Sequence, residues 1–190
     1  MPAVILASGS AARLAVLRAA GLDPEVVVSG VDESAFTAGR PADLAGLLAR
    51  AKAAAVAAGR RAGLVIGCDS LLDLDGRAQG KPGSAGEAAD RWREMSGRTG
   101  TLVTGHCVID AASGQRASAV AGTRVRFGSL SEEEIAAYVA SGEPRGKAGA
   151  YGIQGRAAEF VARIAGSYSG IMGLPLFETA ALLRQASLRF

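Results

Sequence analysis

Residues 4–13 have the sequence VILASGSAAR, and this segment sets the pattern on which the fold is built. The apolar run Val4–Ala7 is typical of a buried strand, and Leu14 and Leu17 follow at helical spacing before Gly21. A strand that leads through a short loop into a helix is a basic unit of α/β folds. The sequence therefore predicts a strand over residues 4–7 and a helix over residues 11–20.

Strand-like and helical segments alternate along the rest of the chain, with one hairpin among them. The capping pair Ser131 and Glu134 marks one helix start, and Ser113-Gly114 marks the hairpin turn. Further helices are expected over residues 41–58, 84–95, 131–141 and 176–185, and strands over 25–28, 64–67, 71–74, 101–109, 117–127 and 160–164. The prediction is an α/β fold of one domain, residues 1–190, with a central mixed β-sheet flanked by helices.

Composition limits the classes of function. With 190 residues and 49% hydrophobic residues the chain can bury the core of one domain, and no apolar run approaches the roughly 20 residues of a membrane span. There is no basic leader, so a cytoplasmic location is expected. Cys68 and Cys107 have only His106 as a companion, which is too few ligands for structural zinc. A net charge of +3 on scattered arginines points to a compact anionic ligand rather than nucleic acid.

The loop Ser8–Arg13 lies between a predicted strand and a predicted helix N-terminus. Free N–H groups and the helix dipole attract anions at such a place, and Arg13 adds a guanidinium that can bind a phosphate. The simpler alternative is that Ser10 only caps the helix and Arg13 is a solvated surface residue.

A second candidate group contains Asp69 and Lys81. Asp69 follows the apolar run 64–67, at the expected carboxyl end of a strand, where ligands of open α/β sheets bind. Its carboxylate suits a divalent metal or a proton from water, and Lys81 suits a phosphate. Alternatively, Asp69 forms a turn and Lys81 is solvated.

Two further groups complete the set. Glu33, beside Asp32, is a possible second metal ligand, and Lys52 on the long helix is a possible phosphate contact, although charged residues in a run are usually solvated. The glycine-rich segment 146–155 predicts a loop whose backbone passes close to a ligand. Gln154 within it carries the donor and acceptor needed to bind a base edge. A flexible loop without a ligand is the alternative.

In this order, the segments resemble the Maf family of nucleotide pyrophosphatases over nearly the whole chain. The resemblance rests on the motifs LASGS with Arg13, SGVDE, LARAKA, GCDSLL, GKP, SGRTG, VTGH, GEPRGKAGAYGIQG and GSYSGIMGLPL. It implies a deep nucleotide cleft, a divalent metal cofactor such as Mg²⁺ or Mn²⁺, and a homodimer.

The resemblance also implies roles for individual residues. Asp69 is implied to accept a proton, Glu33 to act as a metal ligand or catalytic acid, and both to hold the metal. The implied triphosphate contacts are Ser8, Arg13, Lys52 and Lys81, and the implied determinants of base choice are Ser70 and Gln154. The sequence KAGAYGIQG at residues 147–155 is similar to that of the family branch that acts on dTTP and UTP.

The chain departs from the family pattern at two places. Many members have Ser-Pro-Arg-Arg where this chain has Ser10-Ala11-Ala12-Arg13, and Ala-Asp-Thr where it has Cys68-Asp69-Ser70. The expected activity is hydrolysis of a nucleoside triphosphate to the monophosphate and pyrophosphate. Two alternatives stay open: an inosine-triphosphate pyrophosphatase, and a non-catalytic nucleotide sensor of cell division, which the missing arginine would suit.

Overall fold

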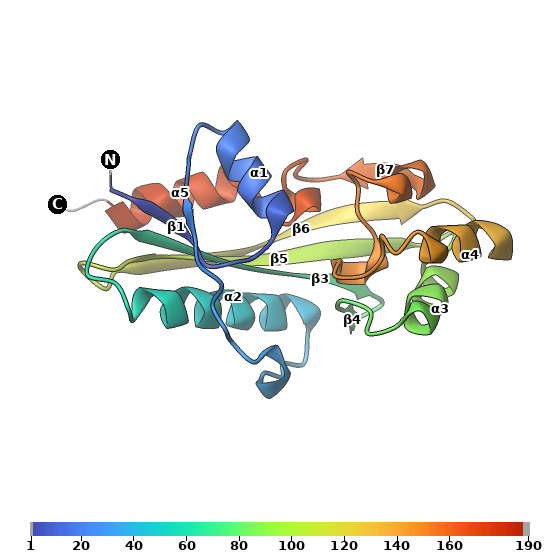
Figure 1. Cartoon of the computed structure of the whole chain (residues 1–190), viewed down its shortest axis with the longest axis horizontal. Coiled ribbons are helices and arrows are strands. Elements are labelled where there is room, and N and C mark those ends of the chain that lie inside the picture. Colours follow the sequence, from blue (N-terminus) through green and yellow to red (C-terminus); the bar gives the residue numbers. More distant parts are fainter. Residues whose placement is uncertain (1, 188–190) are drawn as a thin grey trace.

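The computed structural model describes residues 2–187, which form a mixed β-sheet with helices on both faces (Figure 1). Its strands are β1 (Val4–Leu6), β2 (Glu25–Val26), β3 (Leu64–Leu74), β4 (Arg77–Gln79), β5 (Thr99–Asp110), β6 (Arg116–Phe127) and β7 (Val161–Ala165). The helices are α1 (Ala11–Ala19), α2 (Pro41–Ala57), α3 (Ala85–Met95), α4 (Glu132–Ala140) and α5 (Leu176–Ser187). The predicted α/β fold with a mixed sheet is confirmed. Among the described residues, no helix is long and apolar enough to cross a membrane.

The strand order is β2-β1-β3-β5-β6-β7, with β4 paired to β3. β1 runs parallel to β2 and β3, and the other pairs are antiparallel. The pairing of β1 with β3 ends at Leu6 and Ile66, whereas β3 continues against β5 as far as Asp73. One edge of β3 is therefore left without a strand partner from Gly67 to Leu71, within the described residues. The loop after β1 turns away at this edge and leads into α1.

The structure corrects one expectation about β3. Residues 64–67 and 71–74, expected as two short strands, belong to a single strand, because β5 pairs with it without interruption from Leu64 to Asp73. Asp69 therefore lies inside a strand and not at its carboxyl end. β2 is also shorter than expected, ending at Val26, while the expected helices agree with the observed ones to within two residues.

Helix α2 lies along one face of β3 and β5, and α1 and α5 lie on the other (Figure 1). The inner face of α2 includes three fully buried alanines, Ala45, Ala49 and Ala53. A Cβ on Gly67 would lie 2.3 Å from the carbonyl oxygen of Ala49, and one on Gly105 would lie 2.2 Å from that of Ala45. Small residues on both sides thus let the helix backbone approach the sheet closely.

A separate aromatic core fills the far end of the sheet, where α3 and α4 pack together. Trp92 is fully buried there and makes edge-to-face contacts with Phe127, Tyr138 and Phe160. The indole N–H of Trp92 donates to the carbonyl of Ala150 at 2.9 Å. This core therefore also anchors the glycine-rich segment 146–155.

The contact between α2 and the sheet gives the first prediction. We expect Gly105→Ala to lower the free energy of unfolding by about 3 kcal/mol, the upper part of the range for overpacked cores, because the added methyl meets helix backbone. Urea denaturation measures the change. Gly39→Ala is the control, since a Cβ there meets nothing within 4 Å. Equal stabilities of the two variants would contradict the close approach of α2.

Candidate functional site

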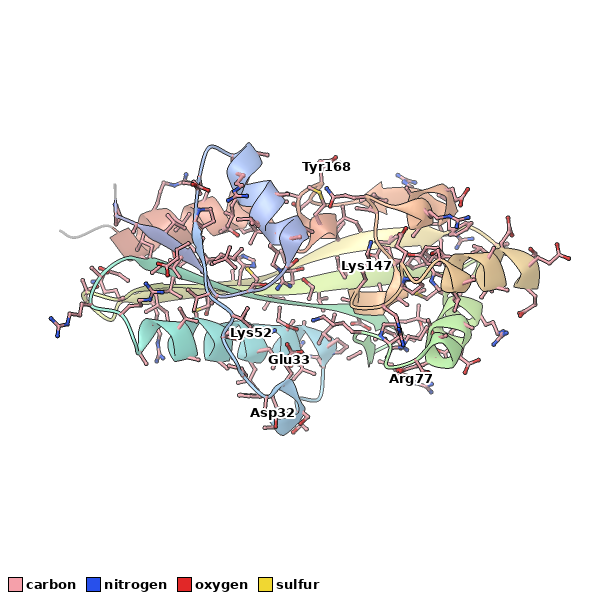
Figure 2. All side chains as sticks on the ribbon, viewed as in Figure 1. Asp32, Glu33, Lys52, Arg77, Lys147 and Tyr168 are labelled. Carbon is pink, nitrogen blue, oxygen red and sulfur yellow. The ribbon has the colours of Figure 1, made fainter. Side chains whose placement is uncertain are left out.

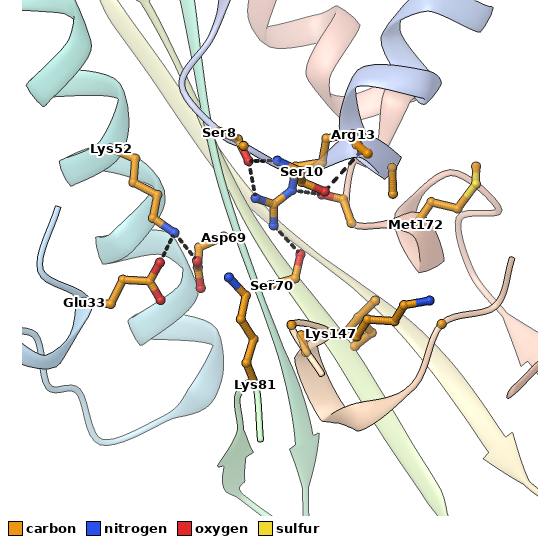
Figure 3. Close-up of a pocket in the computed structure, with 18 of the residues that line it drawn as sticks. Ser8, Ser10, Arg13, Glu33, Lys52, Asp69, Ser70, Lys81, Lys147 and Met172 are labelled. Carbon is orange, nitrogen blue, oxygen red and sulfur yellow. Dashed lines mark hydrogen bonds and ion pairs between the residues drawn. The ribbon is translucent and has the colours of Figure 1, made fainter. Parts of the chain in front are cut away.

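A cleft of about 760 Å³ lies against the open edge of β3, and every site residue expected from the sequence lines it (Figure 3). These residues are Ser8, Arg13, Glu33, Lys52, Asp69, Ser70, Lys81 and Gln154. They come from the loop after β1, the segment before α2, α2 itself, β3, the loop after β4 and the glycine-rich segment. The fold thus brings together residues that are as much as 146 positions apart in the sequence.

The centre of the cleft is a buried lysine shared by two carboxylates. The Nζ atom of Lys52 donates to Oδ1 of Asp69 at 2.6 Å and lies 2.6 Å from Oε1 of Glu33 (Figure 3). Lys52 and Asp69 are both buried, and Glu33 is half-exposed. The one ammonium of Lys52 therefore faces two carboxylates, and the charges of Lys81 and Arg13 also act on Glu33.

The two carboxylates differ in their protonation. Burial raises the pKa of Asp69 above its ordinary value, although the charges of Lys52 and Arg13 oppose that effect. Burial also acts on Glu33, but the hydrogen bond and charge of Lys52 outweigh it and leave the pKa of Glu33 lowered. Asp69 is therefore the stronger base of the two, and Glu33 the more firmly ionised.

Arg13 is buried and not solvated, contrary to the simpler alternative. Its Nε donates to the carbonyl of Gly173 at 2.9 Å, and its Nη1 donates to the carbonyl of Cys68 at 2.9 Å and to Ser8 Oγ at 3.1 Å. Its Nη2 donates to Ser70 Oγ at 3.0 Å. Among the described residues, four of the five guanidinium N–H groups therefore have protein acceptors. The side chain joins α1, β3 and the turn before α5.

Ser10 has the capping role of the simpler alternative. Its side chain accepts from the backbone N–H of Arg13 at 3.4 Å, and its own N–H donates to Ser8 Oγ at 3.2 Å. Ser70 Oγ lies 2.9 Å from Thr104 Oγ1, which is buried on β5. Thr104 was not a candidate, and only its place in the VTGH motif pointed to it.

The other expected residues are arranged differently around the cleft. Lys81 extends from the loop after β4 toward Asp69 (Figure 3). Gln154 is exposed, and its side chain has no hydrogen-bond partner within residues 2–187. Asp32 lies at the outer tip of its segment, where it accepts hydrogen bonds from Ser34, while Glu33 lies toward Lys52 (Figure 2). Asp32 is therefore a turn residue and not part of the charged centre.

His106 and the cysteines take no part in the cleft lining. His106 is fully buried on β5, with Nδ1 3.3 Å from the carbonyl oxygen of Thr104, and burial lowers its pKa. Its Nε2 has no hydrogen-bond partner among the described residues. Cys68 and Cys107 are buried free thiols, and burial raises the pKa of Cys68 to about 11.

The donor set at the centre fits a hard divalent cation that is bound together with substrate. Asp69 and Glu33 supply two carboxylates at one point, and Mg²⁺ is usually held by one or two carboxylates plus substrate phosphates. Within the described part of the chain, no cluster of three or more His, Cys, Asp or Glu side chains forms a complete metal cage. Substrate oxygens would have to complete the coordination.

Comparison with known proteins identifies the family. Residues 3–186 match the family model described as Maf-like protein, and the chain belongs to this family. It is 59% identical to a nucleoside triphosphate pyrophosphatase of Streptomyces coelicolor over 175 residues, which cover 91% of this chain and 85% of the relative. It is 45% identical to a dTTP/UTP pyrophosphatase of Pelotomaculum thermopropionicum over 185 residues, 97% of each chain.

The environment of Asp69 gives the second prediction. In the metal-free protein we expect its pKa to lie above the ordinary value of about 3.9, and Lys52→Met to raise it further by removing the neighbouring positive charge. Protonated Asp69 then favours the folded state at low pH, and this contribution is lost as pH rises through the folded-state pKa. Titration of the side-chain ¹³C carboxyl signal by NMR measures the pKa.

Lys81→Met is the matched control, because it removes a positive charge that lines the same cleft but has no ion pair to Asp69 among the described residues. We expect a smaller rise in this variant. A wild-type pKa at or below the ordinary value would contradict the account of burial at Asp69.

Proposed function

We propose that this chain is a nucleoside-triphosphate pyrophosphatase that hydrolyses dTTP, UTP or a related, possibly modified, nucleotide to the monophosphate and pyrophosphate. The observation that carries the proposal is the pair of carboxylates, Asp69 and Glu33, at the centre of a cleft that also contains Lys52, Lys81 and Arg13. This arrangement combines a base with groups that neutralise phosphate charge. Membership of the Maf-like family and the names of the relatives support it.

The triphosphate is proposed to lie between the loop after β1 and Lys81. Ser8 and the N-terminus of α1 offer hydrogen-bond donors, and the dipole of the helix favours an anion there. Arg13 contributes its positive charge and the one N–H that its protein acceptors leave. Ala12 offers no second guanidinium, so Lys81 and Lys52 carry more of the phosphate binding than in relatives with two arginines.

The chemical step is proposed to be attack of water on the α-phosphorus. Asp69 accepts a proton from the water as its oxygen bonds to phosphorus, and the bond from the α-phosphorus to the bridging oxygen breaks, so that pyrophosphate leaves. In the metal-free protein, burial raises the pKa of Asp69, which makes its carboxylate a stronger base than an exposed one. Lys52 holds Asp69 and Glu33 in place, and the half-exposed position of Glu33 lets it face the substrate.

A divalent cation, Mg²⁺ or Mn²⁺, is proposed as cofactor, with Asp69 and Glu33 as its protein ligands. When bound, it would neutralise phosphate charge and polarise the reacting groups. Because Lys52 already contacts both carboxylates, we expect the ammonium to shift toward phosphate when the metal binds with the nucleotide.

Base choice is proposed to depend on Gln154 and Ser70. The exposed amide of Gln154 lines the cleft and can both donate to and accept from a base edge. The preference for pyrimidines rests on the form KAGAYGIQG and on the name of the Pelotomaculum relative. A homodimer and a cytoplasmic location remain predictions, which light scattering and cell fractionation would test.

The decisive experiment is pyrophosphate release across a panel of ordinary and modified nucleoside triphosphates. We expect release from dTTP and UTP that excess chelator abolishes and Mn²⁺ restores. Preference for inosine triphosphate would instead favour an inosine-triphosphate pyrophosphatase. Absence of release from every nucleotide that binds would favour a non-catalytic sensor, and undiminished release in chelator would contradict the metal.

The control variant in this experiment is Asp69→Asn. The amide keeps the shape of the side chain but does not accept a proton at neutral pH, so we expect turnover to fall at least about 100-fold, the lower limit for general-base catalysis. Circular dichroism checks that the variant is folded. Near-normal turnover would remove Asp69 from the proposed role.

A further inference from the structure

Glu143 precedes the glycine-rich segment 146–155 in the sequence. Its carboxylate contacts residues at both ends of that segment. Its Oε2 accepts from the backbone N–H of Arg156 at 2.8 Å, and its Oε1 accepts from that of Ala157 at 3.5 Å. Oε1 also accepts from the Tyr138 hydroxyl at 3.1 Å and lies 3.6 Å from Nζ of Lys147. The carboxylate thus caps the short helix Arg156–Phe160, whose own N-cap residue is a glycine without a capping side chain.

The backbone at Gly155 is fitted to this carboxylate. A Cβ at residue 155 would lie 2.3 Å from Oε1 and 2.5 Å from Oε2 of Glu143, so a larger residue there would displace the carboxylate. Burial alone would raise the pKa of Glu143, but the hydrogen bonds from Arg156 and Tyr138 outweigh it, and the pKa is lowered. Glu143 is therefore ionised at neutral pH and is a strong acceptor.

The middle of the segment is held by other contacts. The N–H of Gly149 donates to the carbonyl of Gly80 at 2.9 Å, and Trp92 binds the carbonyl of Ala150. Gln154 lies beyond these anchors and only two residues before Arg156. The N–H of Gly155 donates to the carbonyl of Gly152 at 3.0 Å, and Ile153 packs against the aromatic core. The carboxylate of Glu143 also holds this end of the segment, through the backbone N–H groups of Arg156 and Ala157.

We propose that Glu143 is the positioning residue for base recognition, acting through Gln154. This inference rests on the proposed recognition of the nucleotide base by Gln154. Glu143 does not line the cleft and does not touch the nucleotide in this account. Its carboxylate holds the backbone so that the Gln154 amide faces the base.

A double-mutant cycle tests the proposal. In Glu143→Gln one acceptor oxygen is replaced by an NH₂ group that opposes the backbone donors. We expect the KM for dTTP to rise about tenfold, the loss of roughly one hydrogen bond to the base, with kcat changed less than about threefold. The preference for dTTP over dATP should fall by a similar factor. In a Gln154→Ala background the same substitution should have no further effect on either quantity.

Two further variants sharpen the result. Gly155→Ala places a methyl group against the same carboxylate and should displace it. This variant should reproduce the rise in KM and the loss of base preference, even if Glu143→Gln folds poorly. Glu133→Gln, on the exposed face of α4, is the matched control and should behave as wild type.

The proposal is overturned if Glu143→Gln raises KM equally in both backgrounds, or if it lowers kcat and leaves KM and base preference unchanged. If Gln154→Ala alone changes neither the KM for dTTP nor the preference for dTTP over dATP, Gln154 does not recognise the base. The proposed role of Glu143 is then wrong as well. Continued release of pyrophosphate from dTTP in that variant would leave the proposed activity intact.

Discussion

The contact of Lys52 with Asp69 and Glu33 is the interaction on which the arrangement of the cleft depends. Lys52 reaches Asp69 because α2 lies directly on β3, and α2 lies there because Gly67 and Gly105 present no side chain to its alanine face. Removing one partner from a buried ion pair leaves an uncompensated charge, at a cost of about 3–5 kcal/mol. The packing of α2 on β3 therefore determines the distance between Lys52 and Asp69, and a shift of the helix would break their ion pair.

Polar side chains that are shared between segments also hold the loops around this centre. Arg13 ties the start of α1 to β3 and to the turn before α5, while Glu143 ties the two ends of the glycine-rich segment. Arg13 is buried and Glu143 is partly buried, whereas residues of these types are usually exposed. Loops that carry ligand contacts need such anchors, because a loop has no ladder of backbone hydrogen bonds to fix it.

Much of the fold and of the cleft could be predicted from the sequence, since local periodicity indicates whether a segment forms a helix or a strand. The helices, the hairpin and eight of the residues that line the cleft were found from strand, helix and glycine patterns and from the family resemblance. The continuity of β3 was missed, because Gly67 looks like a strand end, and only the pairing with β5 and the approach of α2 explain it. Two of the acceptors of Arg13 are carbonyls of distant segments, and two of the donors to Glu143 are backbone N–H groups that follow the glycine-rich segment. No residue pattern encodes such contacts.

The central claim is that water next to Asp69 attacks the α-phosphorus of a bound nucleoside triphosphate. Hydrolysis of dTTP in H₂¹⁸O, followed by mass spectrometry of both products, tests it most directly. The account predicts one ¹⁸O atom in the nucleoside monophosphate and none in pyrophosphate. Label in pyrophosphate would mean attack on the β-phosphorus, and it would contradict the placement of Asp69 beside the α-phosphorus.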